Sequence, residues 1–133
     1  MRLLLDTHVL LWWMSGDRRL TSLLREAISA RDADVAVSAA SVWEIAIKRA
    51  LGRLDIDLGD LVDAIQADGF AELPVRIEHA AAVEHLPRHH DDPFDRLLIA
   101  QSLVESRRLV TRDRLIGVYS AVPGLNLFWP TTS

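Results

Sequence analysis

The sequence contains no cysteine, only one lysine and no long hydrophobic run. Without cysteine, disulfide bonds and thiolate metal sites are excluded. The composition favours a reducing compartment, so we expect a cytoplasmic protein. The longest unbroken apolar run, residues 9–14, is far shorter than the ~20 residues that a membrane-spanning helix requires. We therefore expect no membrane association.

An excess of positive charge is also missing, because the formal net charge is −4 at pH 7. This balance argues against a protein held on nucleic acid by a broad basic face. It does not exclude a nuclease, because a bound metal would offset the negative charge of the acids that hold it. All basic residues except Lys48 are arginine, which suits phosphate binding but is explained more simply by a GC-rich genome.

Several catalytic signatures are absent as well. The sequence has no glycine-rich dinucleotide fingerprint, no P-loop, no G-x-S-x-G elbow and no His-Glu-x-x-His motif. Nucleotide cofactors, serine hydrolysis and zinc proteolysis therefore have no support.

At 133 residues the chain suits one domain, which we place at residues 1–133. Short apolar runs predict buried strands at residues 3–5, 35–37, 70–75, 109–111 and 125–129. Apolar residues at helical spacing predict helices at residues 9–14, 20–28, 38–51, 61–69, 77–86 and 94–104, with a short helical stretch after Asp113. Strands that alternate with helices imply an α/β fold, which we expect to be a three-layer α/β/α sandwich with a mainly parallel central sheet.

Four acidic residues stand near the junctions of predicted strands and helices: Asp6, Glu44, Asp95 and Asp113. The carboxyl ends of parallel strands share one edge of a sheet, so we expect these side chains to converge there. Four carboxylates would repel one another unless a cation lay among them, and hard oxygen ligands suit Mg²⁺ or Mn²⁺. We predict that these four residues bind such a metal and carry catalysis.

The aspartates also have ordinary structural explanations. Asp6 and Asp113 could cap the helices that follow them. Asp95 could be an acid favoured by the dipole of a helix that Asp92 caps. Taken singly, capping is the more common role, and only the convergence of all four acids favours a metal site.

Glu44 has two structural alternatives of its own. It follows Ser41 at the spacing of a capping box, and it could pair with Lys48 one helical turn later. Its neighbours, however, are mostly apolar, and an acid held against such a face is costly unless it is paired or binds a metal. This setting favours a functional role for Glu44.

Other polar residues near the acids are candidate helpers. Hydroxyls could orient the carboxylates, although ordinary capping is an equal explanation; these supporting candidates are Thr7, Ser38, Ser41 and Thr111. Adjacent histidines on a loop rarely form a complete metal site. We expect substrate contacts instead at His89, His90, Arg96 and Arg112. The tryptophans are expected in the core or an interface rather than as platforms for stacked bases.

The sequence resembles PIN-domain proteins in four segments that occur in the family's order. These are residues 3–12 (LLLDTHVLLW), 38–48 (SAASVWEIAIK), 86–101 (LPRHHDDPFDRLLIAQ) and 111–113 (TRD). The third segment is long and specific, whereas the fourth is short. Together with the small size of the chain, the third segment resembles the VapC-type toxins of bacterial toxin–antitoxin pairs. Two mild departures are Asp91, where relatives often carry a basic or neutral residue, and Ser102, where alanine is usual.

The resemblance implies a PIN-like fold and an endoribonuclease that depends on Mg²⁺ or Mn²⁺. It implies Asp6, Glu44, Asp95 and Asp113 as the acidic quartet, and Asp92 as a supporting acid. It also implies RNA as the substrate, a homodimer, and a small antitoxin that wraps the toxin and masks the acidic pocket.

The four acids and the family resemblance together predict metal-assisted hydrolysis of a phosphodiester bond. Three other functions stay open at this point. A receiver-like signalling domain also gathers acids at a sheet edge, but Ser38 stands at the expected phosphoacceptor position. A protein that only binds partners through an acidic pocket, and a structure-specific DNA nuclease, are the remaining alternatives.

Overall fold

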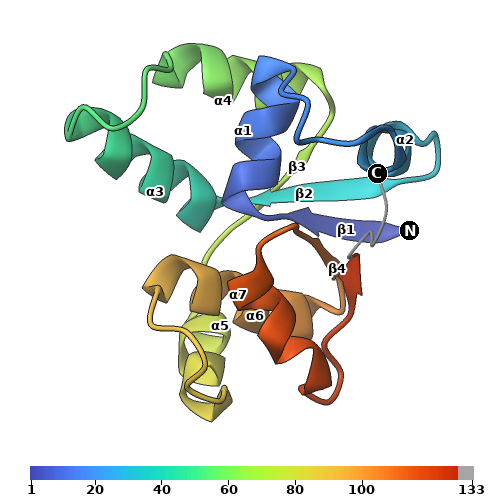
Figure 1. The fold of residues 1–133 in the computed structure, drawn as a ribbon, viewed down its shortest axis with the longest axis vertical. Coiled ribbons are helices and arrows are strands. Elements are labelled where there is room, and N and C mark those ends of the chain that lie inside the picture. Colours follow the sequence, from blue (N-terminus) through green and yellow to red (C-terminus); the bar gives the residue numbers. More distant parts are fainter. Residues whose placement is uncertain (129–133) are drawn as a thin grey trace.

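The computed structural model describes residues 1–128. Five strands form one sheet: β1 (Arg2–Leu5), β2 (Asp34–Ser38), β3 (Ala71–Leu73), β4 (Arg108–Val110) and β5 (Leu127–Phe128). The helices are α1 (Thr7–Ser15), α2 (Ser22–Ser29), α3 (Ala39–Ala50), α4 (Leu58–Ala67), α5 (Ile77–Ala82), α6 (Pro93–Glu105) and α7 (Arg114–Gly117). Two 3₁₀ helices, η1 (Val83–His85) and η2 (Val118–Ala121), complete the described chain (Figure 1).

The strand order is β3-β2-β1-β4-β5, and every neighbouring pair is parallel. Leu4 at the centre of the sheet stands opposite Ala36 of β2 and Leu109 of β4. Because all strands run the same way, their carboxyl ends meet at one edge. Asp6 follows the central strand and therefore lies in the middle of that edge.

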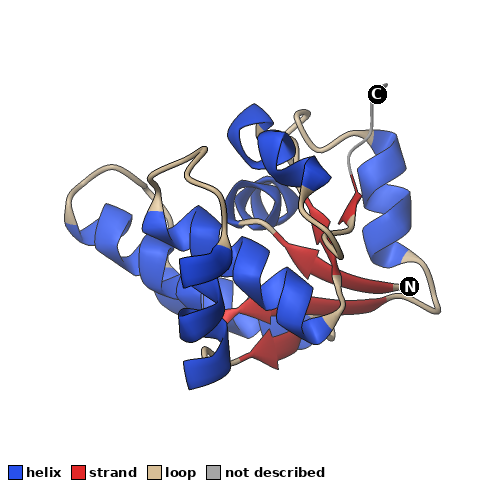
Figure 2. Ribbon diagram, turned by 90° about the horizontal axis from the view of Figure 1, so that it is seen from below, coloured by secondary structure: helices blue, strands red, loops and turns tan. Residues whose placement is uncertain are grey.

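Helices cover both faces of the sheet, which confirms the predicted three-layer α/β/α sandwich (Figure 2). Alternate residues of β1 face opposite layers: Leu3 and Leu5 join the core beneath α1 to α4, whereas Leu4 joins the core beneath α6 and η2. This alternation is the period of a strand. Both cores are needed because the strands are apolar on both faces, as buried parallel strands are.

The helix ends follow from local capping residues. Thr21 accepts a hydrogen bond from the Leu24 amide as the N-cap of α2. Ser38 caps α3 by accepting from the Ala40 amide, so Ser41 lies inside the helix and the capping box proposed for it is not formed. Gly52 follows α3 with a φ of 74°, a left-handed conformation that glycine adopts at no steric cost.

Several predicted boundaries differ from the observed ones. The strand predicted at residues 70–75 is shorter, Ala71–Leu73, because Pro74 cannot donate to a strand ladder. The helix predicted at 77–86 is α-helical only to Ala82, and its last turn is 3₁₀ before the extended Leu86 that precedes Pro87. The last predicted strand reaches Trp129, which lies outside the described residues. None of the described helices is long and apolar enough to cross a membrane.

Candidate metal centre

Asp6 is fixed in the middle of the carboxyl edge by bonds to both of its oxygens. Its Oδ1 caps α1 by accepting from the amides of His8 at 2.6 Å and Val9 at 3.2 Å. Its Oδ2 accepts from the Thr111 hydroxyl, at the end of neighbouring strand β4, at 2.5 Å. The side chain is almost fully buried, with 1% exposure. Two adjacent strands thus hold one carboxylate.

Thr111 connects Asp6 to Asp113. The Thr111 hydroxyl oxygen accepts from the Asp113 amide at 3.0 Å while the hydroxyl hydrogen is donated to Asp6. Asp113 Oδ1 then caps the short helix α7 by accepting from the Leu115 amide at 2.9 Å. The threonine therefore sets the distance between two of the predicted acids.

Asp95 enters the site from the first turn of α6. Asp92 caps this helix, and its Oδ1 accepts from the amides of Phe94 at 2.8 Å and Asp95 at 3.1 Å. The Asp95 Oδ2 is hydrogen-bonded to His90 Nε2 at 2.8 Å. His90, Asp95 and Asp113 each offer a ligand atom, and these atoms lie within 4.8 Å of one another. Such a cluster has room for a cation.

The pKa of Asp95 is affected by burial and by the acids around it. Burial, together with the negative charges of Asp92, Asp6 and Asp113, raises its pKa to about 6 against the opposing effect of the His90 hydrogen bond. Burial also raises the pKa of Asp6, although bonds to its carboxylate oppose that change. The charges of Asp92, Asp6 and Asp113 thus lie close enough to Asp95 to disfavour its ionised form.

Glu44 occupies the same side of the molecule but in a different setting. It is 4% exposed, and its Oε2 pairs with Lys48 Nζ at 2.8 Å, the alternative that the sequence suggested. Its Oε1 is buried with no hydrogen-bond partner among the described residues. One turn earlier, Ser41 accepts a bond of 3.0 Å from the Thr7 hydroxyl, which ties α3 to the start of α1 beside Asp6. The Glu44 carboxylate therefore has one oxygen paired with Lys48 and one oxygen, Oε1, that is free to bind a metal.

These residues fit a divalent metal on two observations. The buried Oε1 of Glu44 lacks a donor among the described residues, and ligand atoms of His90, Asp95 and Asp113 lie within 4.8 Å of one another. Oxygen-rich sites of this kind suit Mg²⁺ and Mn²⁺, and Mn²⁺ also accepts imidazole nitrogen such as that of His90. Asp6, Asp95, Asp113 and Glu44 are the candidate ligands.

The predicted substrate contacts lie at different distances from this cluster. His90 belongs to it through Asp95. His89 is exposed and packs against the Tyr119 ring with centroids 5.2 Å apart. Arg112 is exposed beside Asp113 and donates to the Arg19 carbonyl at 2.7 Å.

Arg96 has a structural setting. Its guanidinium donates to the carbonyls of Pro87 at 2.9 Å and Val83 at 3.2 Å, and to the Tyr119 hydroxyl at 3.1 Å. Tyr119, fully buried, in turn donates to the His90 carbonyl at 3.3 Å. The two side chains thus hold the loop that carries His90. Sequence reasoning missed this role of Tyr119, for which a lone tyrosine in a helical turn gives no signal.

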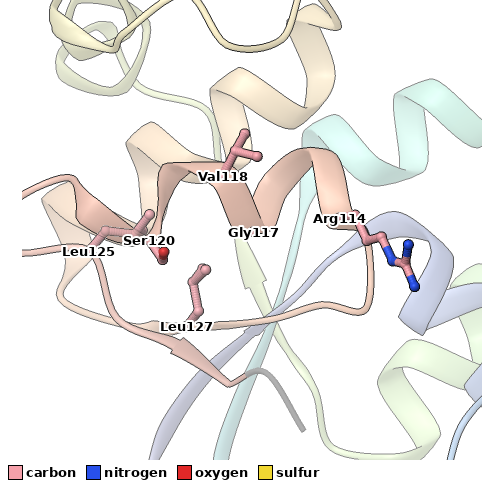
Figure 3. A pocket seen from close by; sticks show the side chains of 6 residues that line it. All are labelled: Arg114, Gly117, Val118, Ser120, Leu125 and Leu127. Carbon is pink, nitrogen blue, oxygen red and sulfur yellow. The ribbon is translucent and has the colours of Figure 1, made fainter. Parts of the chain in front are cut away.

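Two other features lie outside the acidic cluster. His79 is fully buried, accepts from the Arg76 amide at Nδ1 and is bonded to Glu105 at Nε2, so both of its nitrogens serve the fold. A hollow of about 450 Å³ lies beside α7 and β5, where Arg114 stands at one end and Leu125 at the other (Figure 3). Its lining contains none of the acids.

Comparison with known proteins identifies a family and a shared fold. The PIN domain family matches residues 3–120. The chain is 34% identical over 113 residues to Ribonuclease VapC22 of Mycobacterium tuberculosis, an alignment that covers 84% of this chain and 86% of the relative.

Two solved structures show the same fold at low identity. VapBC2 from Rickettsia felis, bound to a DNA fragment from its promoter, aligns with a TM-score of 0.71 at 14% identity over 96% of this chain and 97% of that one. VapBC-1 from nontypeable Haemophilus influenzae aligns with a TM-score of 0.69 at 16% identity over 97% and 98%. From its first strand to its second 3₁₀ helix, the chain belongs to the PIN domain family.

Proposed function

We propose that this protein is an endoribonuclease that depends on Mg²⁺ or Mn²⁺ and acts as the toxin of a toxin–antitoxin pair. The observation that carries the chemistry is the gathering of acids around Asp95, whose pKa is raised by burial and by the charges of Asp92, Asp6 and Asp113. Membership of the PIN family and the likeness to a relative named as a ribonuclease support RNA cleavage.

The proposed site assigns a task to each of its residues. Asp95 and Asp113, whose ligand atoms lie close together, would hold the metal with Asp6, whose charge acts on Asp95, and Glu44 would add its free Oε1. When bound, the ion would lower the pKa of a coordinated water and stabilise charge that develops on the phosphate. Thr111 orients Asp6, and His90 orients Asp95, so that each carboxylate presents a defined oxygen.

No side chain needs to act as the general base in this scheme, because the ion activates the water. The expected cleavage is an in-line displacement that leaves a 5′-phosphate and a 3′-hydroxyl. Lys48 has a separate role: it pairs with Oε2 of Glu44 and leaves Oε1 available.

A small antitoxin and a second copy of the chain are the proposed partners. The solved VapBC structures that share this fold support an antitoxin. A partner that places a cation in the acidic cluster would neutralise the same carboxylates that the metal needs. We accordingly propose that the antitoxin inhibits by occupying this edge of the sheet, and that the toxin is a cytoplasmic homodimer.

Incubation of the purified protein with single-stranded RNA tests the proposed activity. We expect cleavage with Mn²⁺ or Mg²⁺, none with EDTA, and at least a hundredfold loss in Asp6→Asn, because the amide removes a charged ligand but keeps the oxygen that caps α1. Circular dichroism should show an intact fold in the variant. Wild-type cleavage by Asp6→Asn, or cleavage in EDTA, contradicts the proposal.

The alternatives give different results in the same assay. A DNA nuclease would cut an equivalent DNA strand in preference to RNA. A protein that only binds partners through the acidic pocket would cut neither strand, although the metal would still raise its melting temperature.

A further inference from the structure

A second hollow, of about 470 Å³, runs along α1 from the first turn of that helix. Its wall includes His8, Trp12 and Arg19 on one side and Leu54 and Ile56 of the α3–α4 connection on the other. None of the candidate metal ligands lines this hollow, and several of the side chains that do line it are planar.

Three planar groups lie together in it. The rings of His8 and Trp12 are tilted by 37° with centroids 6.2 Å apart. The Arg19 guanidinium carbon stands 5.1 Å from the centre of the Trp12 ring. His8 and Arg19 are exposed, and Trp12 is half-buried, with its other side packed on the core. Aromatic and guanidinium faces of this kind stack nucleobases.

The hollow begins next to the acidic cluster, because His8 in its wall contacts Asp6. The backbone amide of His8 donates to Asp6 Oδ1 at 2.6 Å, so the first residue of the wall touches a candidate ligand. On the far side, Arg112 donates to the Arg19 carbonyl at 2.7 Å and is the neighbour of Asp113 in the chain. A strand whose phosphate reached the acids would therefore have an adjacent nucleotide at the mouth of the hollow.

The charge of the lining favours a base over a phosphate. Arg19 is paired with Asp17 at 2.7 Å, and this bond lowers the pKa of Asp17 to about 2. A further acid, Asp55, also lines the hollow. With Arg19 neutralised and Asp55 present, the lining has no excess of positive charge to hold a phosphate. Neutral planar groups fit it better.

We propose that the hollow lined by His8, Trp12 and Arg19 binds a nucleobase of the substrate strand next to the bond that is cut. This inference rests on the proposed nuclease function and gives it a means of choosing the cleavage site. It also revises the expectation for the tryptophans: Trp12 packs on the core and, with the Arg19 guanidinium over its ring, would line the base site as well.

The test is the affinity for two single-stranded RNAs, one normal and one with abasic sugars at its four central positions, measured by fluorescence anisotropy. All proteins carry Asp95→Asn, which keeps the RNA uncut on the proposed mechanism. We expect the normal RNA to bind about five- to a hundredfold more tightly than the abasic one, the range that stacking of one base gives. Adding Trp12→Leu or His8→Ala should remove that difference by weakening only the normal RNA.

Trp43→Leu is the matched control, because Trp43 is 61% exposed on α3 and lies outside the hollow. It should leave both affinities unchanged. The exposed His8 provides a variant that does not disturb the core if Trp12→Leu lowers stability. Equal binding of the two RNAs, equal loss of both in the variants, or loss only of antitoxin binding overturns the base site. Failure to cut RNA overturns the nuclease instead, since the binding measurement needs no cleavage.

Discussion

At the scale of single residues, the acids of the site serve the fold and the proposed chemistry together. Asp6 caps α1 with one oxygen and receives Thr111 with the other. Asp113 caps α7 and still lies within the cluster of ligand atoms. Capping and metal binding, which the sequence offered as alternatives, are compatible at Asp113, whose cap uses only Oδ1, and at Asp6, where each hydrogen-bonded carboxylate oxygen keeps a further lone pair.

Burial of Asp95 among other acids lowers the stability of the metal-free protein. Its pKa in the folded protein is about 6, above the ordinary carboxyl value, because burial and the neighbouring acids disfavour its charge. Between the two pKa values the folded state holds more protons than the unfolded state, so metal-free stability falls as pH rises through that window. Asp95→Asn should be more stable than the wild type at pH 7.5 in EDTA, by on the order of 3 kcal/mol, and the gain should vanish near pH 4.

Urea unfolding of both proteins at the two pH values measures this gain. Asp91→Asn is the matched control, since Asp91 is an exposed acid nearby. A stability difference that does not change with pH, or an equal gain in Asp91→Asn, contradicts the assignment of repulsion to Asp95.

At the scale of elements, helix N-termini deliver the acids to the carboxyl edge. α1, α6 and α7 each begin at an aspartate cap, and Asp95 sits one turn inside α6. These helix starts could be predicted because capping is local in sequence. The pairing of Glu44 with Lys48 was also predictable, since the two residues are one turn apart. The Thr7–Ser41 bond was not, because it depends on how α1 packs on α3.

Removal of the N-cap of α6 should disturb the site by displacing Asp95. In Asp92→Ala the amides of Phe94 and Asp95 lose their acceptor, which should cost about 1 kcal/mol of stability. The first turn should then fray and misplace Asp95, so metal affinity should also fall. Asp92→Asn keeps an acceptor oxygen and should restore the stability. Chemical unfolding and metal titration of the two variants check this; equal loss of stability in both contradicts the capping role.

At the scale of the whole molecule, a parallel sheet between two apolar cores brings distant residues together. The alternation of strands and helices was sufficient to predict the layers, and the strand order then decides which ends become neighbours. That order places β1 between β2 and β4, so Asp6 meets Thr111 across a sequence distance of 105 residues. His90 was predicted only as a substrate contact. Its hydrogen bond to Asp95 could not be predicted, because it depends on a loop that Tyr119 and Arg96 hold in place.

A crystal soaked in Mn²⁺ and measured for anomalous scattering tests the central claim that these acids form one metal site. We predict a peak within about 2.5 Å of carboxylate oxygens of Asp6, Asp95 and Asp113. The peak should be absent from Asp6→Asn crystals soaked in the same way. A peak only at Glu105 and His79, or none in the wild type, would contradict the account.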